Sequence, residues 1–208
     1  NNWLSEPDRA PTTVNLSVGP LAGRTIFVYT GNMGAAQGMD CLIELAASFK
    51  DNHNVGFLFV GRGSDVARLR AVVASQGLSN VVFIDEVDSI EIPAILDQCH
   101  IGMIALDPRH TTHNIPGKLL TYLRAGLPVL ARINPGNDLE GLINLERIGR
   151  VVAGNENTRL TALARELADD SGLRKEMGER CRALADRQFS SASVVHQIVA
   201  RLQPQQHG

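Results

Sequence analysis

The sequence predicts an α/β domain in which helices cover both faces of a parallel sheet of about six strands. From about residue 25 onward, short β-branched and aromatic runs alternate with segments of helical period. The strand runs are almost wholly apolar, which is typical of parallel strands buried on both faces. With right-handed crossovers, this alternation gives a doubly wound, Rossmann-like sheet. Ligands of such sheets bind at the carboxyl ends of the strands.

The predicted strands are recognised by their β-branched and aromatic content and by the turn residues beside them. The run TIFVYT ends at Gly31, and VGFLFV ends at Gly61. Pro128 follows the helix-ending Gly126 and begins the fifth strand. In chain order the predicted strands are residues 25–30, 55–60, 81–84, 101–106, 128–131 and 151–152.

The segments between the strands carry apolar residues three and four positions apart, as one face of a helix requires. Ser64 is the predicted N-cap of the second helix, and Gly77 its C-terminal stop. Gly126 is predicted to end the fourth helix in the same way. In chain order the predicted helices are residues 39–49, 64–77, 92–96, 118–125, 138–144, 158–170, 172–188 and 190–202.

Composition and charge exclude several classes of protein. Twenty basic against twenty-two acidic residues give a formal charge of −2, and few aromatic residues lie beside basic ones, so no nucleic-acid surface is predicted. No apolar run approaches the roughly 18 residues needed to span a bilayer. Cys41, Cys99 and Cys181 are widely spaced, which fits neither a disulfide framework nor a Cys-x-x-Cys metal site. We therefore expect a cytoplasmic protein.

The chain is predicted to divide into three parts. It opens at Asn1 without an initiator Met and passes several prolines and glycines before the first strand, which is typical of a linker in a longer protein. We expect residues 1–22 to be an interdomain linker and residues 23–190 the Rossmann-like domain. Residues 191–208 are predicted to be a C-terminal helix and tail.

Two loops that follow strands have features of an anion site. The first has glycines at 31, 34 and 38, which match neither the G-x-G-x-x-G fingerprint nor a Walker A loop. Its backbone N–H groups suit an anion at a helix N-terminus, although a plain βα turn explains the glycines equally well. The second loop places Arg62 between two glycines, where its guanidinium either forks onto phosphate oxygens or lies in solvent.

The segment from residue 110 to 130 is the most informative. Residues 114–117 form a polar loop that leads into a helix with Lys118 in its first turn. A lysine there interacts unfavourably with the helix dipole, and a bound diphosphate would supply a reason for it. His110 and His113 read H-x-x-H, but no third Cys or His ligand lies nearby, so we predict no metal site.

Taken together, these segments resemble the C-terminal, donor-binding domain of family 4 glycosyltransferases, the retaining enzymes of the GT-B fold. The stretches FVYTGNMG (27–34) and FLFVGRG (57–63) are similar to the family's first two strands and loops. The stretch IPGKLLTYLRAGLPVL (115–130) resembles its signature (S/G)-K-x-x-E-Y-x-x-x-G-x-P-V. The resemblance covers nearly the whole chain and is nearest to bacterial transferases of O-antigen, capsule and related surface polysaccharides.

The resemblance implies a role for each matching residue. No catalytic residue is assigned in this domain, and the diphosphate leaving group is neutralised by side chains, with no cofactor and no metal. The implied diphosphate-binding residues are Gly31, Asn32, Gly34, Arg62 and Lys118. The implied donor sugar and ribose contacts are His113, Asn114, Ile115, Pro116, Gly117 and Thr121. Glu86 and Val87 fall where the family cradles the nucleobase.

The sequence departs from the family pattern at several of these positions. The family's E-x7-E motif would place carboxylates at 113 and 121, where this chain has His113 and Thr121. A threonine cannot chelate a ribose diol as a glutamate does. The first-loop Arg and Lys that are common in the family correspond to Asn32 and Gln37. We therefore expect the phosphate charge to rest mainly on Arg62 and Lys118.

The resemblance implies a transferase that moves a hexosyl or N-acetylhexosaminyl group from a UDP-type nucleotide sugar to a growing lipopolysaccharide, O-antigen or capsule glycan, with retention. The lipid-linked or oligosaccharide acceptor would bind through a missing N-terminal domain, toward which residues 191–208 would pack. On this view the fragment is inactive alone, and the full-length protein lies at the inner face of the cytoplasmic membrane. A UDP-sugar 2-epimerase of the same fold and a non-catalytic nucleotide-binding module are the alternatives.

Overall fold

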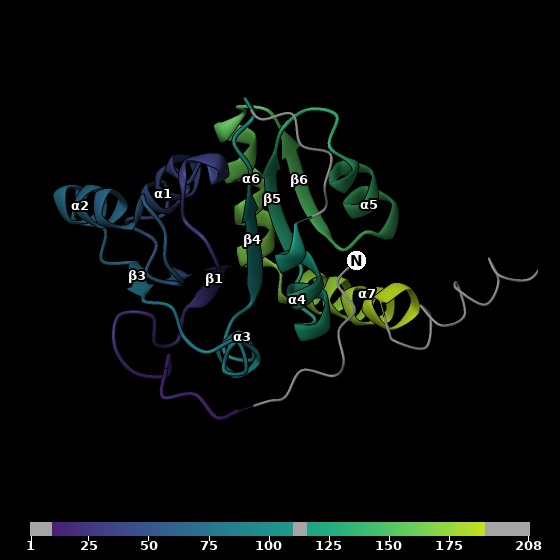
Figure 1. Cartoon of the computed structure of the whole chain (residues 1–208), viewed down its shortest axis with the longest axis horizontal. Coiled ribbons are helices and arrows are strands. Elements are labelled where there is room, and N and C mark those ends of the chain that lie inside the picture. The colour runs from purple at the N-terminus through teal and green to yellow at the C-terminus, as the bar shows by residue number, and fades with distance from the viewer. Residues whose placement is uncertain (1–9, 110–115, 190–208) are drawn as a thin grey trace, which may run out of the picture.

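A single parallel sheet of six strands forms the centre of the molecule (Figure 1). The computed structural model describes residues 10–109 and 116–189. The strand order is β3-β2-β1-β4-β5-β6, which is the order of a doubly wound nucleotide-binding sheet. The strands are β1 (Thr25–Thr30), β2 (Val55–Val60), β3 (Val81–Ile84), β4 (Ile101–Ala105), β5 (Val129–Ile133) and β6 (Gly149–Ala153). The predicted fold class is confirmed. The first three strands have the predicted bounds, and the others differ by one or two residues at their ends.

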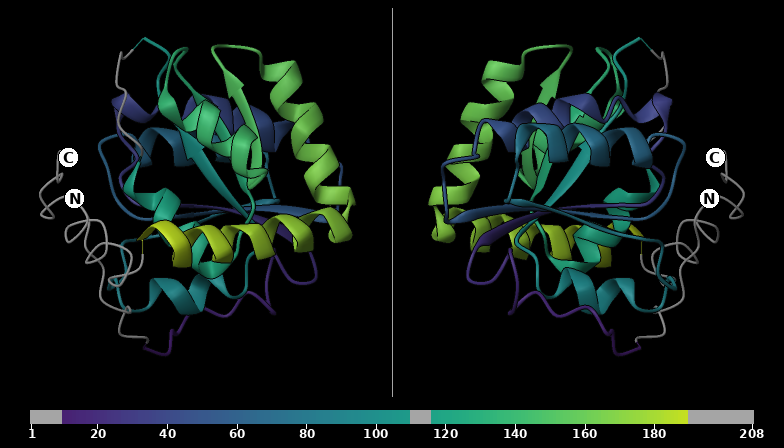
Figure 2. Two further views of the ribbon diagram at one scale, coloured as in Figure 1. Left: turned by 90° about the vertical axis from the view of Figure 1, so that its right-hand side faces the viewer. Right: turned by 90° about the vertical axis from the view of Figure 1, so that its left-hand side faces the viewer.

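Helices pack on both faces of the sheet (Figure 2). They are η1 (Ala35–Gln37), α1 (Asp40–Ala47), α2 (Val66–Gln76), α3 (Ile92–Leu96), α4 (Gly117–Ala125), α5 (Asp138–Glu146), α6 (Asn157–Asp169) and α7 (Ser171–Phe189). One core cluster joins the sheet to α1, α2 and α6, and the other joins it to α3, α4, α5 and most of α7. Successive residues of β1 alternate between the clusters, as the pleat requires. The predicted helix at 190–202 and the segment 191–208 lie outside the described residues.

Two predicted helix C-termini are confirmed, whereas one predicted N-terminus is wrong. Gly77 and Gly126 end α2 and α4 in the left-handed conformation, with φ of +61° and +69°. The predicted N-cap Ser64 is wrong, because α2 begins after Asp65. Asp65 is held there by its own contacts: its N–H donates to the Met33 carbonyl, and its carboxylate pairs with Arg68 at 2.9 Å. The link to the first loop thus decides where this helix begins.

The described part of the predicted linker packs on the domain. Leu16 and Leu21 are buried in the core cluster shared with α3 and α4. The Gln98 side chain accepts from the Leu16 N–H at 2.8 Å and donates to the Val14 carbonyl at 2.9 Å. Residues 10–22 therefore share the core of the Rossmann-like domain, since their leucines are removed from water there.

Strands β1 and β4 separate at the topological switch point. All six residues of β1 pair with β2, whereas the pairing of β1 with β4 covers only Phe27↔Ile101 and Val28↔Gly102. The helix that follows β1 lies on one face and the helix that follows β4 on the other. Such a divergence is where doubly wound sheets bind ligands. The carboxyl ends of β1 and β4, with the neighbouring end of β2, are therefore where a ligand site is expected.

Candidate functional site

The loop after β1 is joined by hydrogen bonds to the loop after β2. The Gly31 N–H donates to the Val60 carbonyl at 2.9 Å, and the Met33 N–H donates to the Arg62 carbonyl at 2.8 Å. The Gly34 N–H donates to the side chain of Gln37 at 3.0 Å. The amides of Gly31, Met33 and Gly34 are thus bonded within the protein, and two of these bonds tie the loop to β2 and to the loop that carries Arg62.

Gln37 organises the exposed end of the same loop. Its Oε1 accepts from the Gly34 N–H and, at 3.2 Å, from the Asn32 side-chain amide. Both Asn32 and Gly31 are exposed at the carboxyl end of β1. Gln37 therefore holds the loop together, and Asn32 is a polar side chain that the loop presents to solvent.

Lys118 lies in the first turn of α4 with its ammonium over the ring of Tyr29. The distance from Nζ to the ring centroid is 3.5 Å, within the range of a cation–π contact. Lys118 is half-buried, and desolvation lowers its pKa to about 7. Tyr29 is fully buried, which raises its own pKa, and its hydroxyl donates to the Asn32 carbonyl at 2.7 Å. Tyr29 was missed in the sequence because a buried aromatic residue in a strand is indistinguishable from ordinary core.

Arg62 extends into solvent beside Glu86. Its side chain is 79% exposed, that of Glu86 is 54% exposed, and Nε lies 3.2 Å from Oε2 of the carboxylate. An exposed pair of this kind contributes at most about 1 kcal/mol, so a phosphate can replace the carboxylate. The loop that carries Arg62 and the first turn of α4, which carries Lys118, both contact the segment 29–34, which places them at one edge of the sheet.

The other predicted contacts lie around these loops in different environments. Pro116 is the extended N-cap of α4, Gly117 is exposed, and Thr121 is half-buried one turn after Lys118. Val87 is partly buried against the core. His113, Asn114 and Ile115 lie outside the described residues, as does His110.

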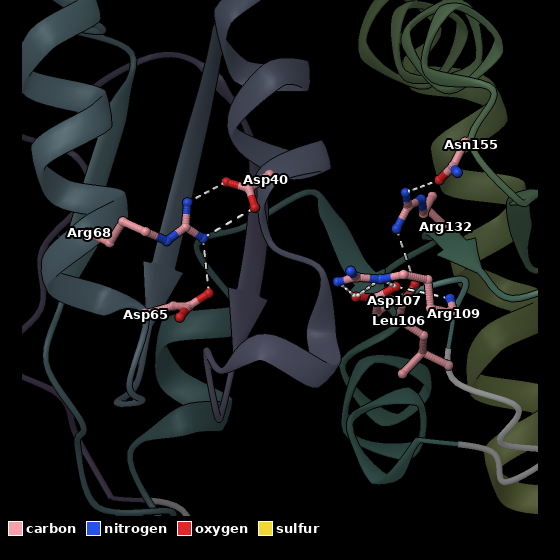
Figure 3. Close-up of polar contacts among 8 residues, drawn as sticks. All are labelled: Asp40, Asp65, Arg68, Leu106, Asp107, Arg109, Arg132 and Asn155. Carbon is pink, nitrogen blue, oxygen red and sulfur yellow. Dashed lines mark hydrogen bonds and ion pairs between the residues drawn. The ribbon is translucent and has the colours of Figure 1, made fainter.

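A second polar cluster lies at the carboxyl ends of β4 and β5 (Figure 3). Asp107 is buried and is held by Arg109, whose Nε and Nη2 approach the carboxylate at 3.0 and 2.6 Å. Buried Arg132 donates to the Leu106 carbonyl and to the side chain of Asn155. These side chains line an open cavity of about 330 Å³. This cluster was missed in the sequence, although Asp107 comes soon after a predicted strand.

Among residues 10–109 and 116–189, the possible metal ligands form no cluster of three, and the thiols are buried. Within these ranges, no three His, Cys, Asp or Glu side chains are placed to hold a metal ion. Cys41, Cys99 and Cys181 are all buried, and burial raises their thiol pKa values to about 11, 12 and 12. The helices of the described part are too short or too polar to cross a bilayer.

Comparison with known proteins places the chain among sugar transferases. The family model described as "Glycosyl transferases group 1" matches residues 24–170. The probable glycosyltransferase WbjE of Pseudomonas aeruginosa is 21% identical over 173 residues, which are 81% of this chain and 43% of WbjE. The chain therefore spans less than half the length of that relative.

Two solved structures show the same fold. WaaG, a glycosyltransferase involved in lipopolysaccharide biosynthesis, aligns with 88% of this chain and 48% of its own at a TM-score of 0.69 and 21% identity. Anabaena Alr3699/HepE, solved in complex with UDP-glucose, aligns with 87% of this chain and 49% of its own at a TM-score of 0.72 and 18% identity. Both alignments confirm the fold over most of the chain.

Proposed function

This chain belongs to the glycosyl transferases group 1 family, and from that premise we propose that it is the donor-binding part of an enzyme that uses a UDP-type nucleotide sugar. The observation that carries the proposal is the placement of Lys118 at the N-terminus of α4, beside the point where β1 and β4 separate. The choice of nucleotide is supported by HepE, whose crystal structure is a complex with UDP-glucose.

The diphosphate of the donor would lie between the first loop and the N-terminus of α4. The first backbone N–H groups of a helix have no partner within it and favour an anion, and Gly117 is exposed there. The ammonium of Lys118 begins the same turn, and Arg62 approaches from the loop after β2. The N–H groups of Gly31 and Gly34 already bond within the protein. We therefore propose that these glycines set the conformation of the loop and that Asn32 makes the polar contact with the diphosphate.

The chemistry of this arrangement is stabilisation of a leaving group. As the bond between sugar and phosphate breaks, negative charge grows on the departing diphosphate while the sugar becomes oxocarbenium-like. Preorganised cations and helix dipoles lower the energy of that state. We propose that Lys118 and Arg62 do this without a metal ion, and that the backbone at Glu86 and Val87 cradles the base. Pro116, Gly117 and Thr121, with His113, Asn114 and Ile115, would contact the sugar and ribose.

We further propose that the acceptor binds elsewhere in a longer protein. The chain spans 43% of WbjE, so a donor domain alone would leave the rest of a transferase unaccounted for. The acceptor would be a growing lipopolysaccharide, O-antigen or capsule glycan, and the transferred group a hexose or N-acetylhexosamine, with retention. The isolated chain would bind donor and transfer nothing, and the whole protein would work at the cytoplasmic face of the membrane.

Calorimetric titration with UDP and UMP tests the proposal. We expect UDP to bind more tightly than UMP, and Lys118→Ala or Arg62→Ala to weaken UDP binding by about 10–100-fold, as the loss of a charge-assisted hydrogen bond implies. Arg70→Ala is the matched control, because Arg70 is also an exposed arginine paired with a carboxylate, that of Asp85. Equal affinity for UDP and UMP would contradict the proposal.

A second measurement separates transfer from the other chemistry of this fold. The isolated chain is incubated with UDP-sugars in the absence of acceptor, and the products are separated by chromatography. We expect the donor to be recovered unchanged. Free UDP together with a 2-epimer of the sugar would show an epimerase and would overturn the assignment as a transferase.

A further inference from the structure

We propose that Tyr29 is a positioning residue of the diphosphate site: its ring holds the Lys118 ammonium, and its hydroxyl holds the first loop at Asn32. The inference rests on the proposed function, since it concerns how two parts of that site are set relative to one another. It assigns a role to a side chain that contacts no substrate and acts through its neighbours.

Tyr29 is itself firmly placed. It is the penultimate residue of β1, the strand between β2 and β4, and its side chain is fully buried. The ring of Phe59 lies beside it, with centroids 6.3 Å apart, on the β2 residue that pairs with Tyr29 in the sheet. A ring packed in this way has little freedom to move, so it can serve as a fixed support.

The contact between Tyr29 and Lys118 joins the two faces of the sheet at its carboxyl end. Tyr29 belongs to the core cluster with α1, α2 and α6, whereas Leu119, Tyr122 and Leu123 of α4 belong to the other cluster. Lys118 nevertheless brings Nζ to 3.5 Å from the centre of the Tyr29 ring. A lysine has a flexible four-carbon stem and many rotamers. The ring face gives its ammonium one favourable position, at the edge where the diphosphate would bind.

The charge state of Lys118 depends on the same contact. Burial lowers its pKa to about 7, whereas attraction to the ring face favours the charged form. A diphosphate arriving at this edge would add a second attraction for the ammonium. Binding of an anion at this edge would therefore favour the charged form of Lys118 further, against the cost of its burial.

The hydroxyl of Tyr29 acts on the other side of the site. It donates to the Asn32 carbonyl at 2.7 Å, and Asn32 also donates from its side chain to Gln37. The Tyr29 hydroxyl thus joins the loop to β1, while the Met33 N–H joins it to the loop after β2. One side chain of β1 thus sets both the ammonium and the loop, which reduces the ordering that ligand binding would otherwise require.

Lysine NMR tests the contact without any ligand. The chain has three lysines, Lys50, Lys118 and Lys175, so the labelled ε-methylene signals are few, and Lys118→Arg assigns the one of interest. A methylene held over an aromatic face is shifted upfield. We expect Lys118 to be shifted upfield of the other two in the wild type and in Tyr29→Phe, and the shift to be lost in Tyr29→Leu. Phe57→Leu, which removes a buried ring on β2 that stacks on Phe27, should preserve it.

A double-mutant cycle tests the role in binding, with the ratio of UDP to UMP affinity as the readout. We expect Tyr29→Leu to lower this ratio about tenfold in the wild-type background and by much less in Lys118→Ala, because the contact between ring and ammonium is already lost there and only the bond to Asn32 remains to be removed. Tyr29→Phe should retain most of the ratio. Additive effects, or an equal loss in Phe57→Leu, would overturn the inference.

The two measurements separate the inference from the function on which it rests. An unshifted Lys118 signal in the wild type would overturn the inference even if UDP binds tightly. A shifted signal without preference for UDP would leave the contact in place and contradict the proposed function. Should Tyr29→Leu fail to fold, the wild-type spectrum and Tyr29→Phe still decide whether the ring holds the ammonium.

Discussion

The hydroxyl of Tyr122 accepts a hydrogen bond from the Thr30 N–H at 3.0 Å, across the gap where β1 leaves β4. A strand N–H that finds no partner in β4 is thereby satisfied from helix α4. Lys118 lies one turn before Tyr122, and residues four apart share one face of a helix. The hydrogen bond between Thr30 and Tyr122 therefore also holds the N-terminal part of α4, and with it Lys118, at the switch point.

Tyr122→Phe should destabilise the fold by about 1–3 kcal/mol, because it leaves the buried Thr30 N–H without a partner. Urea unfolding measures the change. Tyr29→Phe is the comparison: its hydroxyl bonds to the exposed Asn32, where water can replace it, so its cost should be smaller. Equal losses of unfolding free energy in the two variants would contradict the prediction that the buried bond to Thr30 contributes more than the bond to Asn32.

Gly102→Ala should destabilise the fold by about 1–3 kcal/mol through overpacking. A Cβ at residue 102 would lie 2.5 Å from the ring of Tyr122, which passes directly over this β4 residue. Gly141→Ala is the control, because a Cβ there meets nothing within 4 Å and the site lies inside helix α5. That change should stabilise by about 0.5–1 kcal/mol. Thermal unfolding of the pair should show shifts of opposite sign.

Lys118→Met should raise the melting temperature at pH 6, and the gain should shrink toward pH 10. The pKa of Lys118 is lowered from 10.5 to about 7 by burial. Between these values the unfolded chain keeps a proton that the folded chain has lost, so wild-type stability rises with pH through this window. The penalty that methionine removes is therefore largest below about pH 7.

Melting curves of Lys118→Met and wild type at several pH values measure this trend. Lys175→Met, at an exposed position on α7, is the control and should show no such trend. A gain for Lys118→Met that is the same at pH 6 and pH 10 would mean that Lys118 is not desolvated in the folded protein. The same variant should lose its preference for UDP over UMP, so that stability and binding change in opposite directions.

Glu86→Gln should strengthen UDP binding by up to about fivefold at low salt, because the Glu86 carboxylate competes with the diphosphate for Arg62. Since both side chains are exposed, added salt should reduce the effect. Asp85→Asn, which alters the similar pair with Arg70, is the control. Weaker UDP binding by Glu86→Gln would instead indicate that the carboxylate itself contacts the nucleoside. Calorimetry at two salt concentrations measures these outcomes.

Local patterns in the sequence were sufficient for the fold and for the residues that we propose for the site. The parallel sheet followed from apolar runs of strand length that alternate with helical periods, because burial on both faces imposes that composition. Arg62 was selected because it lies between two glycines at the carboxyl end of a strand, and Lys118 because a lysine in the first turn of a helix is unfavourable without an anion. The C-terminal ends of α2 and α4 could also be predicted, because the left-handed conformation that ends a helix favours glycine.

Only the tertiary structure decided which side chains support the site. Tyr122 and Thr30 are 92 residues apart in the chain, and Arg132 and Asn155 come from different strand–loop units. No local pattern encodes such pairs, because they depend on the order and separation of the strands. The start of α2 at Asp65 likewise depends on a contact with the first loop. The sequence by itself determined the sheet and the edge at which we propose the donor binds, and packing across the gap between β1 and β4 determined how Lys118 and Tyr29 meet there.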